Sequence, residues 1–170
     1  MILLTRRRSH RKSDSKRFYD WVERAGEDMI VAGILMRDDR CYKSSAFHCQ
    51  QAIEKALKAY ILLNTGDLVD GHNISWLCKK AMRLDSKFYE WLDESAVLNK
   101  CYIETRYPTD WPFDVSEEDI KVAYKMALDM FEFICRQVDE DVDDMENNGY
   151  DVSKGDYAND SVYKGNTPGQ

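Results

Sequence analysis

Three polar side chains recur at four-residue intervals in one segment of the chain: Gln50, Glu54 and Lys58. On a helix, residues four apart lie one above another, so these three would share one face. A lysine can contact phosphate as a point charge, a carboxylate can orient a cation, and an amide can bond neutral groups. The spacing therefore predicts a polar stripe able to bind an anionic ligand. An apolar flank stands beside it, formed by Ala46, Ile53, Leu57, Tyr60 and Ile61.

A second set of candidate side chains lies further along the chain. Arg106 offers five donors in a planar fork, suited either to a phosphate or to an ion pair with Glu54. Tyr107 is suited to stacking on a base, and packing within its loop is the alternative. His72 stands where a helix is expected to begin, which is a natural anion site, although capping alone would explain it.

Each member of the polar stripe also has an ordinary structural explanation. Lys58 could be a solvated lysine on a helix face. Gln50 and its neighbour Gln51 could either bond a base edge or bond across the seam of a dimer. The sequence leaves these alternatives open.

Other catalytic patterns are missing from the sequence. The three histidines lack metal-site spacing, and His48 next to Cys49 makes no zinc pattern. No Gly-rich phosphate loop and no Ser-His-Asp order stands out. The five cysteines contain no C-x-x-C pair and are expected to be reduced and structural. We therefore predict no metal, no cofactor and no assigned catalytic residue.

Apolar residues spaced three and four apart predict an all-α protein. No segment alternates in the manner of a strand. The expected fold is an antiparallel up-and-down bundle of about five helices, the last one capped by Ser116. The predicted helices cover residues 18–37, 42–64, 72–84, 86–105 and 116–138.

Length and composition fit one compact domain: 170 residues, 44% of them hydrophobic and 32% charged. No apolar run approaches the roughly 20 residues needed to span a bilayer, so we expect a cytoplasmic protein that does not enter membranes. We predict a basic disordered arm at residues 1–15, the bundle at 16–140, and an acidic then polar disordered tail at 141–170.

The net charge of −7 is unevenly distributed. Seven basic residues fall within the first seventeen, which leaves 17 basic against 30 acidic residues, a formal charge of −13, for residues 18–170. An acidic body argues against a broad nucleic-acid groove, because lysine and arginine supply most of that affinity. RNA binding is possible through the arm but is not favoured.

The amphipathic helix expected at residues 18–37 and three later motifs together resemble the HEPN domain family. The three motifs are residues 50–60 (QQAIEKALKAY), residues 71–77 (GHNISWL) and residues 106–108 (RYP), and the resemblance extends over about residues 18–138. It implies a helical bundle that is usually a homodimer. It also implies pairing with a minimal nucleotidyltransferase protein, in the manner of a toxin–antitoxin pair.

The residues that follow Arg106 distinguish two functional classes within the HEPN family. Ribonuclease members of the family carry an Arg followed, after four to six intervening residues, by a His. Counted from Arg106, those positions hold Trp111, Pro112 and Phe113 instead. The chain resembles the Arg-Tyr-Pro branch, which implies a noncatalytic module.

The leading hypothesis is that this module binds a nucleotide such as ATP, or a nucleotidyltransferase presenting one. The predicted site comprises Gln50, Glu54, Lys58, His72, Arg106 and Tyr107. The alternatives are a divergent ribonuclease toxin using His48 or His72, and a bundle that serves only oligomerisation.

Overall fold

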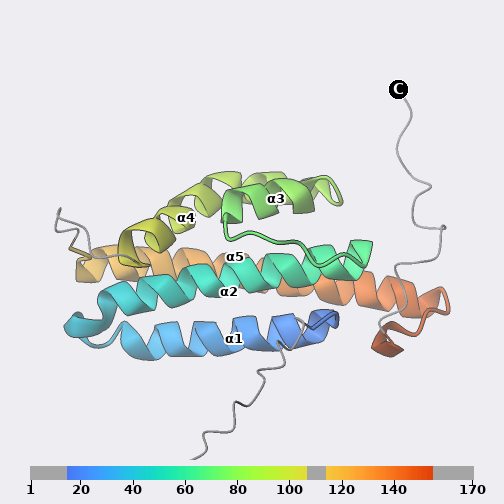
Figure 1. Ribbon diagram of the computed structural model, residues 1–170, viewed down its shortest axis with the longest axis horizontal. Coiled ribbons are helices and arrows are strands. Elements are labelled where there is room, and N and C mark those ends of the chain that lie inside the picture. The colour runs from blue at the N-terminus through green and yellow to red at the C-terminus, as the bar shows by residue number, and fades with distance from the viewer. Residues whose placement is uncertain (1–14, 107–113, 155–170) are drawn as a thin grey trace, which may run out of the picture.

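The protein is all-α in the computed structural model, which describes residues 15–106 and 114–154, with only the backbone for residues 101–106 and 154. Short 3-10 turns occupy Asp39–Cys41, Ser86–Trp91 and Val152–Lys154. No residue in these ranges belongs to a strand, so the predicted fold class is confirmed (Figure 1). The helices are α1 (Phe18–Leu35), α2 (Tyr42–Thr65), α3 (Ile74–Met82), α4 (Leu92–Arg106) and α5 (Glu117–Asn147).

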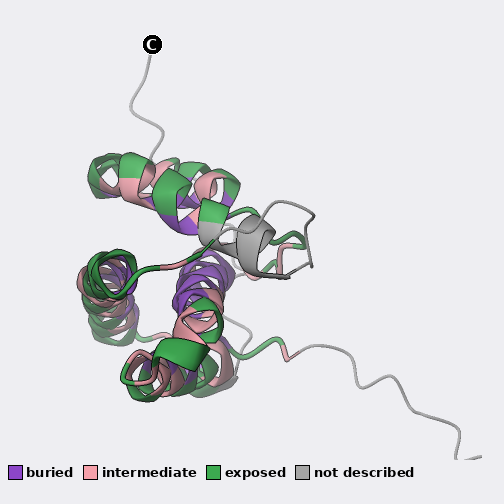
Figure 2. Ribbon diagram, turned by 90° about the vertical axis from the view of Figure 1, so that its left-hand side faces the viewer, coloured by how far each residue is buried: buried purple, intermediate pink, exposed green. Residues whose placement is uncertain are grey.

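The four long helices alternate in direction along the chain, as expected for an up-and-down bundle (Figure 1). Helix α2 contacts α1, α3, α4 and α5 and is therefore the central element. Figure 2 shows its buried turns enclosed by helices whose outer surfaces are exposed. A functional group on α2 is thus held by most of the bundle.

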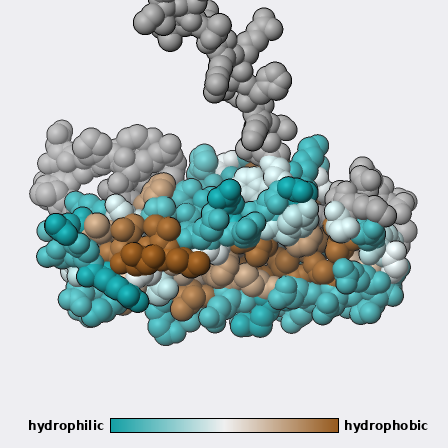
Figure 3. Space-filling model, turned by 90° about the horizontal axis from the view of Figure 1, so that it is seen from below, coloured by the Kyte–Doolittle hydropathy of each residue, from teal (hydrophilic) through white to brown (hydrophobic). Residues whose placement is uncertain are grey.

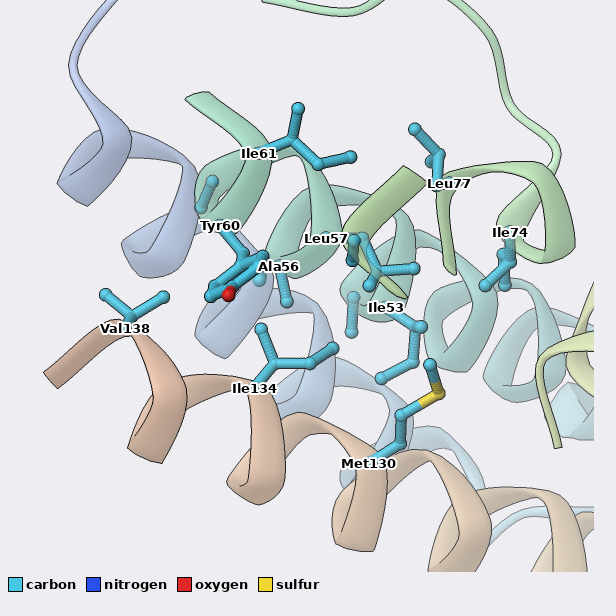
Figure 4. Packing of buried hydrophobic residues seen from close by; sticks show 14 of the residues in the cluster. Ile53, Ala56, Leu57, Tyr60, Ile61, Ile74, Leu77, Met130, Ile134 and Val138 are labelled. Carbon is cyan, nitrogen blue, oxygen red and sulfur yellow. The ribbon is translucent and has the colours of Figure 1, made fainter. Parts of the chain in front are cut away.

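Helix α2 can occupy the centre because most of its side chains are apolar or small. Ala52, Ala56 and Ala59 are almost completely buried, which lets neighbouring helices approach closely. Figure 4 shows α2 side chains pointing toward α5 side chains across the core. The labelled residues of this core are Ile53, Ala56, Leu57, Tyr60 and Ile61 of α2, Ile74 and Leu77 of α3, and Met130, Ile134 and Val138 of α5.

The predicted helix at residues 86–105 does not begin as an α-helix. Its first six residues form the 3-10 turn Ser86–Trp91, and α4 starts only at Leu92. Side chains three apart are eclipsed in a 3-10 turn, and Phe88 and Trp91 both reach Phe133 of α5, with ring centroids 5.0 and 5.3 Å away. The 3-10 turn therefore places the rings of both Phe88 and Trp91 against the ring of Phe133.

Helix α5 starts as predicted and ends later than predicted. Ser116 is its N-cap and forms a reciprocal capping box with Asp119. The helix continues past Val138, where the apolar pattern fades, to Asn147. Met145 is buried there, so the predicted tail boundary at residue 141 falls inside the helix.

A polar contact joins the ends of α2 and α5. Asn64 Nδ2 donates to Asp141 Oδ2 at 2.8 Å, and Asp141 also has a side-chain hydrogen bond with the buried Tyr60. Burial raises the pKa of Asp141, and the charges of Asp85 and Asp144 act in the same direction. The pKa of Tyr60 is raised too, by burial and then by the Asp141 charge.

We predict that Asp141→Asn stabilises the protein at neutral pH. Because the folded pKa of Asp141 lies above the unfolded one, the protein loses stability as the pH rises from the unfolded pKa through the folded pKa. The gain should vanish as the pH falls below about 4, the ordinary value for an aspartate. Urea unfolding at several pH values measures it, and the exposed Asp139→Asn is the charge-matched control. A variant less stable than the parent at pH 7 would contradict the prediction.

Candidate functional site

A buried carboxylate lies at the centre of the polar stripe on α2. Glu54 and Lys58 are only 4% and 6% exposed. Glu54 Oε1 accepts from Lys58 Nζ at 2.9 Å and lies 2.9 Å from His72 Nδ1. A carboxylate only accepts, so the Nδ1 atom of His72 must carry the hydrogen. Two potentially cationic groups therefore converge on one buried anion.

Two amides complete the set of bonds around Glu54. Its Oε2 atom accepts from Gln50 Nε2 at 3.2 Å and, at the longer distance of 3.4 Å, from Gln51 Nε2. Gln51 Nε2 also donates to Gln50 Oε1 at 2.7 Å, and Gln50 Nε2 donates to the His72 backbone oxygen at 3.1 Å. Both carboxylate oxygens are thus bonded. We call Gln50, Gln51, Glu54, Lys58 and His72 the Glu54 cluster.

The start of α3 positions His72 within this cluster. The N-cap of α3 is Asn73, whose side chain accepts from Trp76 N at 2.9 Å, so His72 is not the capping side chain. The next amide, of Ile74, donates to Asn99 Oδ1 on α4 at 2.9 Å. His72 is therefore held next to α2 by the cap, by α4 and by Glu54. Its imidazole remains 60% exposed.

A second carboxylate centre joins α1 to α2. Asp28 Oδ1 lies 2.9 Å from His48 Nδ1, and Asp28 Oδ2 accepts from Lys55 Nζ. Asp28 is buried, while His48 and Lys55 are partly exposed. The described residues provide no hydrogen-bond partner for His48 Nε2. An imidazole held through Nδ1 by a carboxylate is oriented to exchange a proton at Nε2.

The structure brings together four of the six predicted site residues: Gln50, Glu54, Lys58 and His72. Arg106 is the last residue of α4, but its side chain lies outside the described residues, as does Tyr107. Their contribution to the site, including the Glu54–Arg106 pair, stays a prediction.

Sequence reasoning missed Asp28, Lys55 and Trp21. Lys58 Nζ lies 5.6 Å from the ring centroid of Trp21, a cation–π contact that helps to hold the lysine. A usable signal was present for Asp28: it falls among Ala25, Met29 and Ala32 on the buried face of α1. An acid on an apolar face needs a partner.

Some other chemistries lack support in the described part of the chain. No group of three or more His, Cys, Asp or Glu side chains within it is placed to hold a metal ion. Burial raises the pKa of the Cys78 and Cys135 thiols to about 11, which disfavours the nucleophilic thiolate. Among the described helices, none is long and apolar enough to cross a membrane.

The fold and this site define a small helical bundle with a polar centre on its central helix. The HEPN domain model matches residues 18–138, and the chain belongs to the HEPN family. The family predicted from the sequence motifs is thereby confirmed.

Two relatives were found. A candidate toxin from Methanocaldococcus jannaschii, MJ1304, is 28% identical over 128 residues, covering 67% of this chain and 83% of that protein. The crystal structure of ST0689, an archaeal HEPN homologue, is similar with a TM-score of 0.58 and 26% identity. That similarity covers 73% of this chain and 99% of the other.

We predict that Glu54→Leu destabilises the fold by about 3 to 5 kcal/mol, because it leaves Lys58 buried without its anion. Adding Lys58→Met should restore most of the loss, since an apolar pair of similar volume can replace a buried ion pair. Urea unfolding measures both effects. Asp129→Ala, which breaks the exposed Lys125–Asp129 pair of the same spacing, is the control and should change stability little. A double variant no more stable than Glu54→Leu would argue against this account.

Proposed function

We propose that this HEPN protein is a noncatalytic binding module. Its ligand is a nucleotide such as ATP, either free or presented by a minimal nucleotidyltransferase partner. The ligand phosphates contact the cationic side chains at the Glu54 cluster and Arg106. Glu54 positions these groups, and the amide of Gln50 supplies neutral hydrogen bonds.

The observation that carries the proposal is the buried charge of Glu54 on the most enclosed helix of the bundle. Replacing a buried ion pair by apolar residues is often neutral or stabilising, so packing alone gives little reason for Glu54 and Lys58 to be here. Their arrangement also keeps the His72 imidazole exposed beside them. A role in orienting ligand-binding groups would explain why Glu54 and Lys58 occupy this buried position.

The individual side chains suit this role to different degrees. The Lys58 ammonium has three N–H donors, and one goes to Glu54 in the described contacts. Because Lys58 is almost completely buried, its remaining donors can reach a phosphate only where the cluster meets the surface of the protein. His72 is far more accessible. Arg106 is suited to a bidentate phosphate contact, and Tyr107 to stacking on the base.

The similarity to MJ1304, a candidate toxin, supports a place for this chain in a toxin–antitoxin-like pair. Such a role fits a module whose ligand is delivered by a partner. The antitoxin in this proposal is the nucleotidyltransferase, and the acidic body makes a protein or nucleotide ligand more suitable than an extended nucleic acid.

Isothermal titration with ATP, GTP and CTP tests the nucleotide site. We expect at least one nucleotide to bind, with roughly tenfold or greater loss of affinity, about 1.4 kcal/mol, in His72→Ala and in Arg106→Ala. Arg83→Ala removes an exposed arginine just beyond α3 and should leave binding unchanged. Equal loss in all three variants would indicate a nonspecific charge effect. Absence of binding, both alone and with the purified partner, would contradict the proposal.

A second candidate function is RNA cleavage, favoured by the Asp28–His48 contact. His48 Nε2 is suited to take the proton from a ribose 2′-hydroxyl as that oxygen attacks the adjacent phosphorus. The bond from phosphorus to the 5′-oxygen then breaks, a 2′,3′-cyclic phosphate forms, and the 5′-oxygen takes a proton from water. Asp28 would hold the imidazole in the required orientation. This arrangement would replace the histidine missing after Arg106.

The His48→Ala variant tests the second candidate function, RNA cleavage. If the protein cleaves single-stranded RNA in the presence of a metal chelator, His48→Ala should lower the rate about 10² to 10⁴-fold. Asp28→Asn should lower it less and alter the pH profile, because it disturbs only the orientation of the ring. Cleavage that survives His48→Ala would rule out this candidate.

A further inference from the structure

Glu94, on the first turn of α4, carries a carboxylate oxygen that no described group of the protein bonds. Among the side chains that the structure describes, its Oε2 atom is the one buried nitrogen or oxygen atom without a hydrogen-bond partner. A buried acceptor without a donor costs free energy, and folded proteins leave few of them. The presence of a carboxylate here therefore calls for a reason other than folding.

Glu94 borders an open depression of about 490 Å³ between the start of α4 and the first half of α5. The apolar walls of this depression are Trp91, which precedes α4, and Val122 and Met126 of α5. Val122 is 56% exposed, while Trp91 and Met126 are half-buried. Small-molecule sites occupy about 300 to 1,000 Å³, so the depression has room for a small ligand or a single side chain that brings the missing donor.

Two lysines of α5 also border the depression, and each has a carboxylate of its own. Lys121 Nζ donates to Glu117 Oε1, and Lys125 Nζ donates to both carboxylate oxygens of Asp129, at 2.9 and 2.8 Å. Both pairs join residues four apart on α5 and are neutral. The charge that remains at the depression is the negative charge of Glu94, which favours a cationic ligand.

An unpaired polar atom distinguishes this depression from the other apolar surface of the protein. Figure 3 shows hydrophobic side chains gathered on the α1 side of the molecule, where Ile30 and Ile34 are 65% and 60% exposed. No buried polar side-chain atom of α1 lacks a partner, so that surface does not specify the chemistry of a ligand. The depression beside Glu94 does specify it.

We propose that this depression binds a guanidinium group carried on a short aliphatic chain. A guanidinium presents N–H donors in a planar fork, and one of them would bond Glu94 Oε2. The indole of Trp91 would add a cation–π contact, and the aliphatic chain would cover Val122 and Met126. A guanidinium suits the site better than an ammonium, because it is more weakly hydrated and costs less to move beside apolar walls.

The guanidinium can come from two sources, which share this chemistry. One is a free small molecule, and the other is an arginine side chain of another protein. The depression shares no residue with the Glu54 cluster. Binding here is therefore independent of the proposed nucleotide site and adds to that proposed function.

The first test is an NMR titration of the full chain with n-butylguanidinium, followed at the indole N–H of Trp91. The neutral analogue n-butylurea has the same shape and should bind at least tenfold more weakly. Glu94→Gln should raise the Kd for n-butylguanidinium at least tenfold, whereas Glu90→Gln, which removes an exposed carboxylate one turn earlier, should leave it unchanged. Equal binding of the two ligands, or an unchanged Kd in Glu94→Gln, would overturn the proposal.

A second ligand distinguishes the two sources of the guanidinium. N-acetyl-arginine methylamide presents the same group on a peptide backbone. If it binds at least as tightly as n-butylguanidinium, with the same dependence on Glu94, an arginine of another protein is the source. If only n-butylguanidinium binds, the source is a free small molecule. If neither binds, the proposal is wrong.

The Glu94→Met variant separates a binding role from a structural one. It removes the unpaired buried oxygen, so the free variant should have a higher Tm than the parent. Saturating n-butylguanidinium should raise the Tm of the parent, because a ligand that binds only the folded state stabilises it, but should not raise that of the variant. n-Butylurea at the same concentration is the control. A variant with a lower Tm than the parent would show that Glu94 supports the fold, which contradicts the proposal.

Discussion

The burial of the Glu54 carboxylate constrains much of this structure. A charge removed from water must be compensated by nearby cations and hydrogen-bond donors, and the donors here come from two places along the chain. Gln50, Gln51 and Lys58 are supplied by α2 itself. His72 is supplied by the segment before α3, which must therefore return across α2 before the next helix begins. The path of that connection and the polar residues of the central helix thus both serve to compensate the buried charge of Glu54.

The two carboxylate centres give α2 a different character on each side. Toward α5 it is an ordinary core helix with interlocking apolar side chains. On the side facing α1 and the start of α3 it carries Glu54, which contacts Lys58 and His72, and it supplies His48 and Lys55 to Asp28 of α1. A polar seam of this kind weakens nonspecific association of the helices, because any other register would leave buried charges without partners. The seam therefore favours one arrangement of the bundle while keeping two imidazoles accessible.

Periodicity was sufficient to predict the helices and the Gln50–Glu54–Lys58 stripe, because those patterns depend only on residues close in the sequence. The approach of His72 to Glu54 joins residues 18 apart, and that of Asp28 to His48 joins residues 20 apart, so neither follows from local spacing. The 3-10 start of the fourth predicted helix depends on Phe133 of α5, and the extension of α5 depends on burial of Met145. Local patterns identified the elements, and tertiary contacts determined how they meet.

The contact between the Ile74 amide and Asn99 has a mechanical consequence. Asn99 lies on α4 seven residues, or two turns, before Arg106, so one rigid helix connects the residue that anchors the start of α3 with the arginine at its own end. A force applied at the end of α4 is transmitted along the helix axis to the α3 cap and from there to His72. The backbone at the end of α4 and the segment that carries His72 are therefore coupled, and a displacement of α4 changes the position of His72 beside Glu54.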